Sequence, residues 1–532
     1  MTQYSTQTNE FLNTNKSIHE VVMVVDQYGH FKDSITSSPA AKSAFGEPVA
    51  VPITPVIQLD GLYGLQEKNF ETFDAFGGTA DTTNTLMRCQ TGTNLYGYGV
   101  LRSRRAVRYR PGQGALTRFT AAFTESAPGV GVSGYTQRAG FFTQEQALQI
   151  GFDGENFGIL RQNEGKAHIE TLTITTGATV ASNVTVTLNN TAYTVPVSAS
   201  SNLSITAAEI SSWFKANQSA WTVEHHDGIV NFLSTSIGVK AGTFSFSGGT
   251  TNAVGSTSTT QAGNPDTNNW VYQSNFNIDK LDGTGPSGMT LDATKLNVYQ
   301  INFRWLGAGE LRFAIENPTN GEMIFFHKIS YANQNIDVHL DNPSLKIGYV
   351  AASLGGSGTN VTVTGASMMG AIEGLIESTT LTTAANRLTN DSFVADTLHH
   401  GLTVHNRLSF GGKINTRELF IKDISLVATP STGQDHPVKV SLFYNFNGQL
   451  DPIVFKIINS TQSSAFYSDD TGTLTLGANV PVYTFFITAP GYETIDLENL
   501  RLIIPPNNDL TIAFESTATL DGIGIGVTFT ED

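Results

Sequence analysis

Apolar and polar residues alternate along much of the chain. Leu148, Ile150 and Phe152 are separated by Gln149 and Gly151, and the same period of two recurs in many short runs. Successive side chains of a strand point to opposite faces of a sheet, so this alternation predicts strands with one buried face. The Asp-Gly pair that follows these residues predicts a tight turn and a returning strand.

Further strand candidates follow in the second half of the chain. They are KLNVYQINFRWL at 295–306, ELRFAIENP at 310–318, EMIFFHKIS at 322–330, and six evenly spaced runs between about 402 and 532. Short strands separated by turn residues at regular spacing are typical of β-sandwiches.

Residues 166–264 differ from their surroundings in being rich in Thr, Val, Ser and Ala. A hairpin is predicted around Asn189-Asn190, and the clearest helix of the chain follows it. Thr206 and Glu209 have the spacing of a capping box, and an apolar face with helical spacing comes directly after. The residues of that face are Ile210, Trp213 and Phe214. We expect an inserted module with one helix on a small sheet.

The order of features elsewhere resembles a lectin-type or laminin-G-type jelly roll. A strand is followed by an R-x-G-F-F motif, an Asp-Gly hairpin and a W-x-G-x-G-x-L-R-F motif. We therefore expect a mainly β fold in four parts. The parts are an extended arm over 1–100, a jelly-roll β-sandwich over 101–165 plus 265–400, the inserted α+β module over 166–264, and a C-terminal β-sandwich over 401–532.

Prolines mark the expected arm. Pro48, Pro52 and Pro55 punctuate a run that otherwise looks extended. Proline cannot donate a ladder hydrogen bond, so this spacing suits an edge or a segment that lies over another surface. The surface would belong either to a partner or to the body of the same chain.

The composition also favours β structure. Only 14% of the residues are charged, against roughly 25% in ordinary soluble domains. The net charge of −16 argues against general binding to nucleic acid or to an anionic membrane. Cys89 is the only cysteine, which excludes an intrachain disulfide, and we expect it to be a buried small hydrophobe.

The first residues carry neither a basic region nor an apolar core of a signal peptide. No window approaches the roughly 20 apolar residues that a membrane helix needs. We expect the protein to be made in a cytosol and, if it ends up outside a cell, to get there as part of an assembly or by lysis.

Motifs for catalysis are missing. The sequence has no CxxC, no GxSxG, no Walker loop and no GxGxxG after a strand. His225-His226 and His399-His400 are interpreted as solvated loop residues, because adjacent residues on a strand point to opposite faces and cannot easily share a metal. We expect no enzyme activity, no cofactor and no metal. A calcium site among loop carboxylates and a polysaccharide depolymerase stay open as alternatives.

Five arginines gather in the run LRSRRAVRYR. They are Arg102, Arg104, Arg105, Arg108 and Arg110. Like charges this close repel, so carboxylates or water are expected opposite them. Our favoured hypothesis is ion pairing across subunit contacts or with the arm. A solvated face, and contact with phosphate or an anionic glycan, are the alternatives.

Several motifs resemble a family of virion structural proteins from marine tailed phages, with relatives in large algal viruses. They are RYRPGQGALTRFTA at 108–121, RAGFF at 138–142, IGFDGENFGILRQ at 150–162, DKLDGTGPSGMTLDATK at 279–295, FRWLGAGELRFAI at 303–315, His327 and NPSLKI at 342–347. The resemblance implies a component of the virion and carries no catalytic residue. It leaves open whether the component belongs to a tail, baseplate, fibre or capsid.

The favoured function is therefore a structural part of a virus particle. Such a part would contact copies of itself, as a trimer or hexamer, and other virion proteins. The alternative is an adhesin that binds a host-surface glycan, with aromatic and amide side chains as its contacts. The candidates are Trp270, Tyr272, Tyr444 and Asn447.

Overall fold

The structure is a computed structural model that describes residues 52–66, 68–124, 131–374, 382–431, 433, 435–446 and 452–531. Two compact units divide the chain. The first comprises Met1–Thr54 and Glu373–Leu375, and most of it lies outside the described residues. Within it, the Thr54 hydroxyl donates a hydrogen bond to the carbonyl of Gly374 (2.7 Å). The second unit holds everything else.

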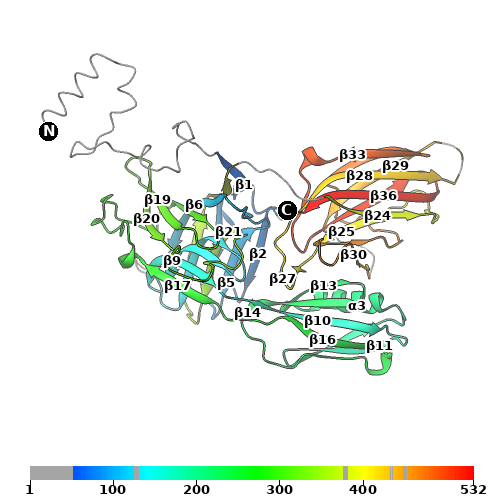
Figure 1. Cartoon of the computed structure of the whole chain (residues 1–532), viewed down its shortest axis with the longest axis horizontal. Coiled ribbons are helices and arrows are strands. Elements are labelled where there is room, and N and C mark those ends of the chain that lie inside the picture. Colours follow the sequence, from blue (N-terminus) through cyan, green and yellow to red (C-terminus); the bar gives the residue numbers. More distant parts are fainter. Residues whose placement is uncertain are drawn as a thin grey trace, which may run out of the picture. The chain divides into compact units, whose positions relative to one another are not determined.

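Two antiparallel sheets form the first sandwich of the second unit (Figure 1). One sheet has the order β20 (Met323–Ile329), β19 (Leu311–Glu316), β18 (Asn297–Arg304), β6 (Gly114–Thr124), β22 (Thr362–Gly365), β4 (Leu86–Gln90) and β3 (Thr79–Thr83), with β1 (Ile53–Asp60) and β23 (Ser367–Glu373) off this path. The other has the order β17 (Thr267–Tyr272), β9 (Asn156–Asn163), β8 (Ala147–Asp153), β7 (Tyr135–Phe142), β21 (Lys346–Ser353), β5 (Tyr98–Ser103) and β2 (Phe70–Ala75).

The core of this sandwich lies between the two sheets. Phe123 and Tyr299 of the first sheet pack against Phe152 and Phe157 of the second, with Phe123 6.0 Å from Phe152 between ring centroids. These side chains are the apolar members of the alternating runs, so the period of two in the sequence gives each sheet its buried face. The predicted hairpin is confirmed, since Asp153 pairs with Asn156 across the turn between β8 and β9.

Residues 53–103 differ from the expected arm. They form β1 to β5, which take places in the two sheets of the sandwich. Met87 and Cys89 alternate with polar residues on β4 and are fully buried, so this stretch has the burial pattern of a paired strand. The expectation for Cys89 is confirmed. Residues 1–51, including Pro48, lie outside the described residues.

The strands from 167 to 261 pair only with one another. A four-stranded sheet has the order β13 (Trp221–His226), β14 (Ile229–Ile237), β10 (Ala167–Thr176) and β16 (Val254–Gln261), and a three-stranded sheet has the order β12 (Thr191–Val197), β11 (Ser182–Leu188) and β15 (Ser245–Ser247). Helix α3 (Leu203–Asn217) packs its Ile210 and Phe214 on the core that these sheets share. The predicted turn at Asn189-Asn190 is confirmed, and both residues adopt the left-handed conformation.

The predicted capping box is wrong. Helix α3 begins at Leu203, one turn earlier, because the Asn202 side chain accepts a hydrogen bond from the Ser204 amide (3.0 Å). Thr206 is buried instead and accepts from the Ala178 amide (3.0 Å). Glu209 accepts from the Ser198 amide, so both polar side chains hold the segment before the helix.

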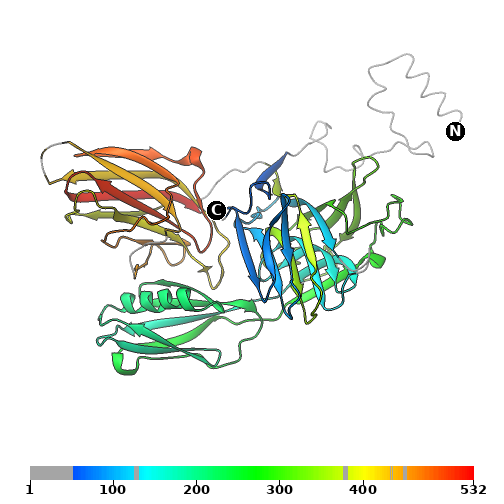
Figure 2. The same cartoon turned by 180° about the vertical axis from the view of Figure 1, so that it is seen from behind.

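A second sandwich is built from the C-terminal third of the chain (Figure 2). One sheet has the order β24 (Thr382–Thr389), β36 (Leu520–Glu531), β28 (Leu419–Pro430) and β33 (Gly491–Asp496), and β34 (Ile503–Ile504) also pairs with β28. The other sheet has the order β30 (Lys456–Ile457), β31 (Ala465–Ser468), β25 (His399–Asn406), β35 (Asp509–Ser516), β29 (His436–Tyr444) and β32 (Tyr483–Ala489). Strand β24 pairs with β36, so this sandwich begins before residue 401.

The predicted fold class is confirmed. The chain is mainly β, with a jelly-roll sandwich, an inserted α+β module and a C-terminal β-sandwich. Over the ranges that the structure describes, no helix has both the length and the apolar character to span a bilayer.

Candidate functional site

Strands β9 and β17 form one edge of the seven-stranded sheet, and one face of this pair changes character along its length. Val271 pairs with Ile159, and both side chains pack on the core. Further along the same face, Asn269 pairs with Arg161, and then Thr267 pairs with Asn163. Because side chains two apart share a face, the apolar lining gives way to polar groups where the strands leave the core.

These polar groups line an open recess of about 570 Å³. Its other wall is the segment 331–341, which follows β20. The lining residues are Arg161, Asn163, Glu164, Thr267, Asn269, Tyr331, Ile336, Asp337, Val338 and Asp341. Amides, carboxylates, a guanidinium and one aromatic ring therefore converge on a space large enough for a small molecule.

Hydrogen bonds tie the two walls of the recess together. Arg161 Nη1 donates to the carbonyl of His339 (3.1 Å), and its guanidinium lies over the Tyr331 ring (5.6 Å to the centroid). The Asp341 amide donates to Asn163 Oδ1 (3.1 Å). Three groups of the lining are thus held in place before any ligand binds, which lowers the entropic cost of binding.

Other polar groups of the recess are available to a ligand. Within the described residues, the side chains of Asn269, Asp337 and Asp341 have no hydrogen-bond partner. Ile336 is fully exposed and supplies an apolar surface beside them. Planar amides and carboxylates can each bond two neighbouring hydroxyl groups, and an apolar surface can cover a C–H face. The arrangement suits a polyhydroxylated ligand.

The electrostatics of the recess favour a ligand without negative charge. Glu164, Asp337 and Asp341 outnumber Arg161. Glu164 accepts a hydrogen bond from the Thr267 hydroxyl (2.6 Å), which fixes one carboxylate against β17. Carboxylates can accept hydrogen bonds from neutral hydroxyls, while an anionic group would meet net repulsion.

The opposite face of the same strand pair carries two of the predicted glycan contacts. Trp270 and Tyr272 are two residues apart on β17, with their rings 6.4 Å apart and nearly parallel (18°). The Tyr272 hydroxyl donates to Asp153 (2.9 Å), and this hydrogen bond is the main cause that raises the pKa of Tyr272. Both rings are half-buried and together form a small aromatic platform beside the sheet.

The other two predicted glycan contacts do not join this site. Tyr444 belongs to the C-terminal sandwich, where it packs on the core and its hydroxyl accepts from the Ile503 amide (2.9 Å). Burial raises its pKa to about 12. Asn447 lies outside the described residues.

Three arginines of the basic run have partners in the same chain. Arg102 pairs with Glu71 (2.9 Å), Arg105 pairs with Glu418 (3.0 Å), and Arg104 donates to Asn508 Oδ1 (3.0 Å). Arg108 and Arg110 also make polar or electrostatic contacts. Glu71 lies on β2, which is a strand of the sandwich and not an extended arm, so ion pairing with an arm also stays a prediction. Ion pairing across subunits stays a prediction.

The interpretation of the two histidine pairs as solvated loop residues is wrong. His225-His226 lie on β13 and His399-His400 on β25, and all four side chains are buried. Three of them pack against aromatic rings, for example His399 against Phe514 (5.5 Å), while His400 lies 2.6 Å from the carbonyl of Asp470. Within the described ranges, no three His, Cys, Asp or Glu side chains form a group that could hold a metal ion.

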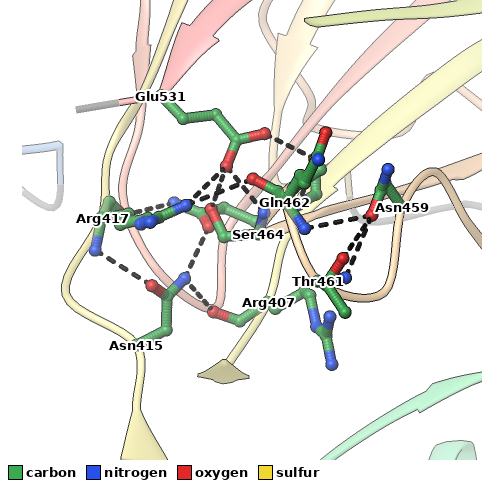
Figure 3. A network of polar contacts seen from close by, with 11 residues as sticks. Arg407, Asn415, Arg417, Asn459, Thr461, Gln462, Ser464 and Glu531 are labelled. Atoms are coloured by element: carbon green, nitrogen blue, oxygen red, sulfur yellow. Dashed lines mark hydrogen bonds and ion pairs between the residues drawn. The ribbon is translucent and has the colours of Figure 1, made fainter. Parts of the chain in front are cut away.

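A buried polar network closes one end of the C-terminal sandwich (Figure 3). Glu531 of β36 accepts hydrogen bonds from the Ser464 amide (2.7 Å) and hydroxyl (2.9 Å), and Arg417 lies 3.6 Å away. Asn415 donates to the carbonyl of Arg407 (2.7 Å). The Glu531 carboxylate is fully occupied within the protein, so the network stabilises the sandwich and is not a ligand site.

The recess was not predicted from the sequence. Its lining comes from the ends of two strands that the inserted module separates, and from a loop further along. One signal was present: the apolar alternation of β9 ends in the polar run Arg161–Glu164, and the segment 331–341 is rich in Asn and Asp. Polar residues that continue the buried face of a strand indicate that this end of the core is accessible to water.

The fold and the recess define a mainly β sandwich protein with a polar, ligand-sized site at the edge of one sheet. No protein-family model and no curated protein sequence matches the chain. Among solved structures it is similar to arcelin-5, a lectin-like defence protein from Phaseolus vulgaris, at 9% identity and a TM-score of 0.21 over 61% of this chain and 99% of that one.

Two further solved structures match at a similar identity and TM-score. Peanut lectin in complex with a peptide matches at 10% identity and a TM-score of 0.24, over 62% of this chain and 100% of the lectin. The carbohydrate recognition domain of Emp47p matches at 9% identity and a TM-score of 0.23, over 64% and 100%. Likenesses this distant carry no conclusion about ligands, which has to come from the residues of the recess.

Proposed function

We propose that this protein binds carbohydrate through the recess between β9, β17 and the segment 331–341. The observation that carries the proposal is the lining itself. Amide and carboxylate side chains that lack hydrogen-bond partners among the described residues line an open space of about 570 Å³, with Tyr331 and Ile336 beside them. The ligand class is a neutral sugar, because the carboxylates of the recess outnumber its single guanidinium.

The test is a glycan array followed by calorimetry with the best neutral glycan. Asn269→Ala removes an amide from the recess, and we expect it to weaken binding about 5- to 10-fold, as the loss of one or two hydrogen bonds does. Asn268→Ala is the matched control, because Asn268 is the next residue of β17 and points to the opposite face. Equal affinities of both variants and the wild type would refute the recess as the site.

The Trp270–Tyr272 platform provides a second comparison. A sugar that stacks on these rings would lose affinity in Trp270→Ala and keep it in Asn269→Ala. The opposite result would place binding in the recess alone. The two faces of one strand pair can therefore be separated with single substitutions.

We also propose that the protein is a component of a virus particle and assembles with copies of itself. The segments that resemble virion proteins support this, since 138–142, 150–162 and 303–315 supply strands to both sheets of the jelly-roll sandwich. None of the three supplies more than two residues of the recess, so the resemblance concerns the scaffold. Mass spectrometry of purified particles and light scattering of the purified protein test location and oligomeric state. A monomer absent from particles would refute both.

We propose in addition that the protein is not an enzyme. Incubation with host capsular polysaccharide and an assay for new reducing ends test this. Sustained release of reducing ends would overturn the proposal and favour a depolymerase.

A further inference from the structure

Strand β13 of the inserted module meets the C-terminal sandwich in a polar junction, which comprises Glu224, His225, His226 and Asp227 on one side. Glu224 accepts hydrogen bonds from the Leu408 amide (2.6 Å) and the Ser409 hydroxyl (2.9 Å). The Asp227 amide donates to the carbonyl of Phe455 (2.8 Å). These hydrogen bonds lie beside an apolar cluster, in which Ile169 and Leu233 of the module pack with Leu408.

His225 is the most enclosed group of this junction. Its Nε2 lies 2.8 Å from the carbonyl of Ile453. A carbonyl oxygen only accepts, so Nε2 carries a proton, and in the neutral ring the lone pair is then on Nδ1. Nδ1 is buried and has no hydrogen-bond partner within the described residues. The Phe455 ring covers one side of the imidazole (5.4 Å between centroids).

The groups that face His225 from neighbouring elements are mostly basic. Lys215 approaches from α3, His405 from β25 and His226 from β13 itself, and each disfavours a positive charge on His225. His405 packs on the same Phe455 ring (5.1 Å). Arg407 follows β25 and lies over the Phe466 ring (4.7 Å), which His226 also contacts (4.5 Å).

Arg407 adds a fixed positive charge to the junction. Its Nε and Nη1 are buried without a hydrogen-bond partner among the described residues. Figure 3 shows its guanidinium pointing away from the Glu531 network. The junction therefore holds one permanent cation against aromatic rings already, and a second one nearby would be costly.

The carboxylates of the junction are committed elsewhere. Glu224 bonds Leu408, Ser409 and the Asn231 amide group, and Asp227 lies 3.3 Å from His226. Asp509 lies 3.9 Å from His405 Nδ1. On the neighbouring β30 and β31 side, Lys456 is paired with Asp469. Among the residues that the structure describes, no carboxylate bonds His225.

We propose that His225 makes this junction acid-labile, so that protonation of its Nδ1 releases the inserted module from the C-terminal sandwich. A proton on Nδ1 would have no acceptor and would face Lys215, His405 and His226. Release of the module exposes the imidazolium to water, which solvates its charge. The inference concerns a conformational change and goes beyond sugar binding in the recess.

The direction of the pH effect follows from the histidine's environment. Burial and then the charge of Lys215 lower the pKa of His225 to about 3 in the closed junction. An exposed imidazole has a pKa of about 6.5, so the closed state keeps its full stability above that pH. Below it, the equilibrium shifts toward the open state by up to about tenfold for each pH unit, until the pKa of the closed state is reached.

Hydrogen exchange of the full chain between pH 7.5 and 4.5 tests this, after correction for the intrinsic pH dependence of exchange. The amides of Asp227 and Leu408 report opening because both donate across the junction. We expect their protection to fall about 10- to 100-fold between pH 6.5 and 4.5. The amides that pair β13 with β14 should stay protected, which separates release from unfolding of the module.

His225→Gln removes the titrating ring and keeps an N–H that can reach the Ile453 carbonyl. We expect this variant to keep its junction protected at pH 4.5. His436→Gln, on β29 outside the junction, is the matched control and should behave as wild type. Constant protection of Asp227 and Leu408 in the wild-type protein would overturn the proposal. So would an equal loss of protection in His225→Gln, a comparison that does not depend on sugar binding.

Discussion

At the scale of single residues, Glu71 shows how a buried carboxylate pairs with basic side chains in this acidic protein. Its carboxylate bonds both Arg102 Nε (2.9 Å) and Lys346 Nζ (2.7 Å) on the seven-stranded sheet. Burial alone would raise its pKa, but the charges and hydrogen bonds of Lys346 and Arg102 lower it to about 2. Burial lowers the pKa of Lys346 to about 8.

The first prediction concerns this carboxylate. A folded-state pKa of about 2, against 4.5 unperturbed, means that Glu71 stabilises the fold above pH 4.5 and loses this effect as the pH falls toward 2. The contribution is about 3 kcal/mol at neutral pH. Glu71→Gln should lower the free energy of unfolding by about that amount at pH 7, measured by urea denaturation. Its deficit relative to wild type should shrink at pH 3, and a deficit independent of pH would contradict the assignment.

A second residue-scale prediction concerns Gly151 on β8. Its φ is +155°, and a Cβ there would lie 1.9 Å from the carbonyl oxygen of Gln137 on the paired strand. Gly151→Ala should therefore destabilise the sandwich by roughly 3 kcal/mol or more, since backbone has to move. Gly433→Ala is the control, because no atom of the described residues lies within 4 Å of the added atom. Thermal unfolding of both variants decides, and similar melting temperatures would be unexpected.

Sequence patterns at this scale predicted what local spacing determines. Cys89 was expected in a core because it is a small apolar residue, and it is buried. The two histidine pairs were interpreted as solvated loop residues, and this interpretation misplaced His225 and His399 on the surface. Phe455 and Phe514, which pack on them, come from more than 100 residues away, although Phe393, close in sequence, also contacts His399 (5.2 Å). Burial of a polar side chain by distant elements leaves no local signal.

At the scale of elements, helix α3 depends on its first turn. Asn202 is the N-cap, and Glu209 and Thr206 hold the preceding chain. Two patterns compatible with a helix start lay four residues apart in the sequence, Asn202 before Leu203 and Thr206 with Glu209. Contacts with Ala178 and Ser198 decide between them by engaging the side chains of the second pattern.

The prediction at this scale follows from the cap. Asn202→Ala should cost about 1 kcal/mol of module stability, and Asn202→Asp should cost little because its carboxylate can accept the same hydrogen bond. Circular dichroism on heating measures both variants. A larger effect of Thr206→Ala than of Asn202→Ala would not contradict the cap, since Thr206 is buried. An Asn202→Ala variant with unchanged stability would contradict the cap.

At the scale of the whole molecule, the inserted module leaves and re-enters the sandwich at one point. Lys166 and Asn264 exchange two backbone hydrogen bonds of 3.0 Å each. The module has a hydrophobic core of its own, around Phe214 and Phe232. Both features are those of a part that can fold by itself.

We therefore predict that the module is dispensable for the sandwich. Replacing 167–263 with a two-residue Asn-Gly turn should leave a folded β protein, and the isolated residues 166–264 should show a cooperative thermal transition. Circular dichroism and neutral-sugar binding test the shortened chain, and calorimetry tests the isolated module. Aggregation of the shortened chain together with loss of sugar binding would show that the sandwich needs the module.

The β-sandwiches themselves could be predicted because their alternation is local and repeats many times. The recess could not. It forms only when β9 pairs with β17 across the whole inserted module and the segment 331–341 joins them. Three stretches that are remote in sequence supply a few polar side chains each, so no single window contains the pattern.

The closely spaced ends of the module have an evolutionary consequence. A segment whose two ends are joined by one hydrogen-bonded pair, Lys166 with Asn264, can be gained, lost or exchanged as one cassette while the register of β9 and β17 is preserved. Substitutions in the cassette and in the host sandwich are then free to accumulate at different rates. Homologous chains should differ most in the presence and identity of this segment, and engineered proteins could carry a foreign domain at the same position.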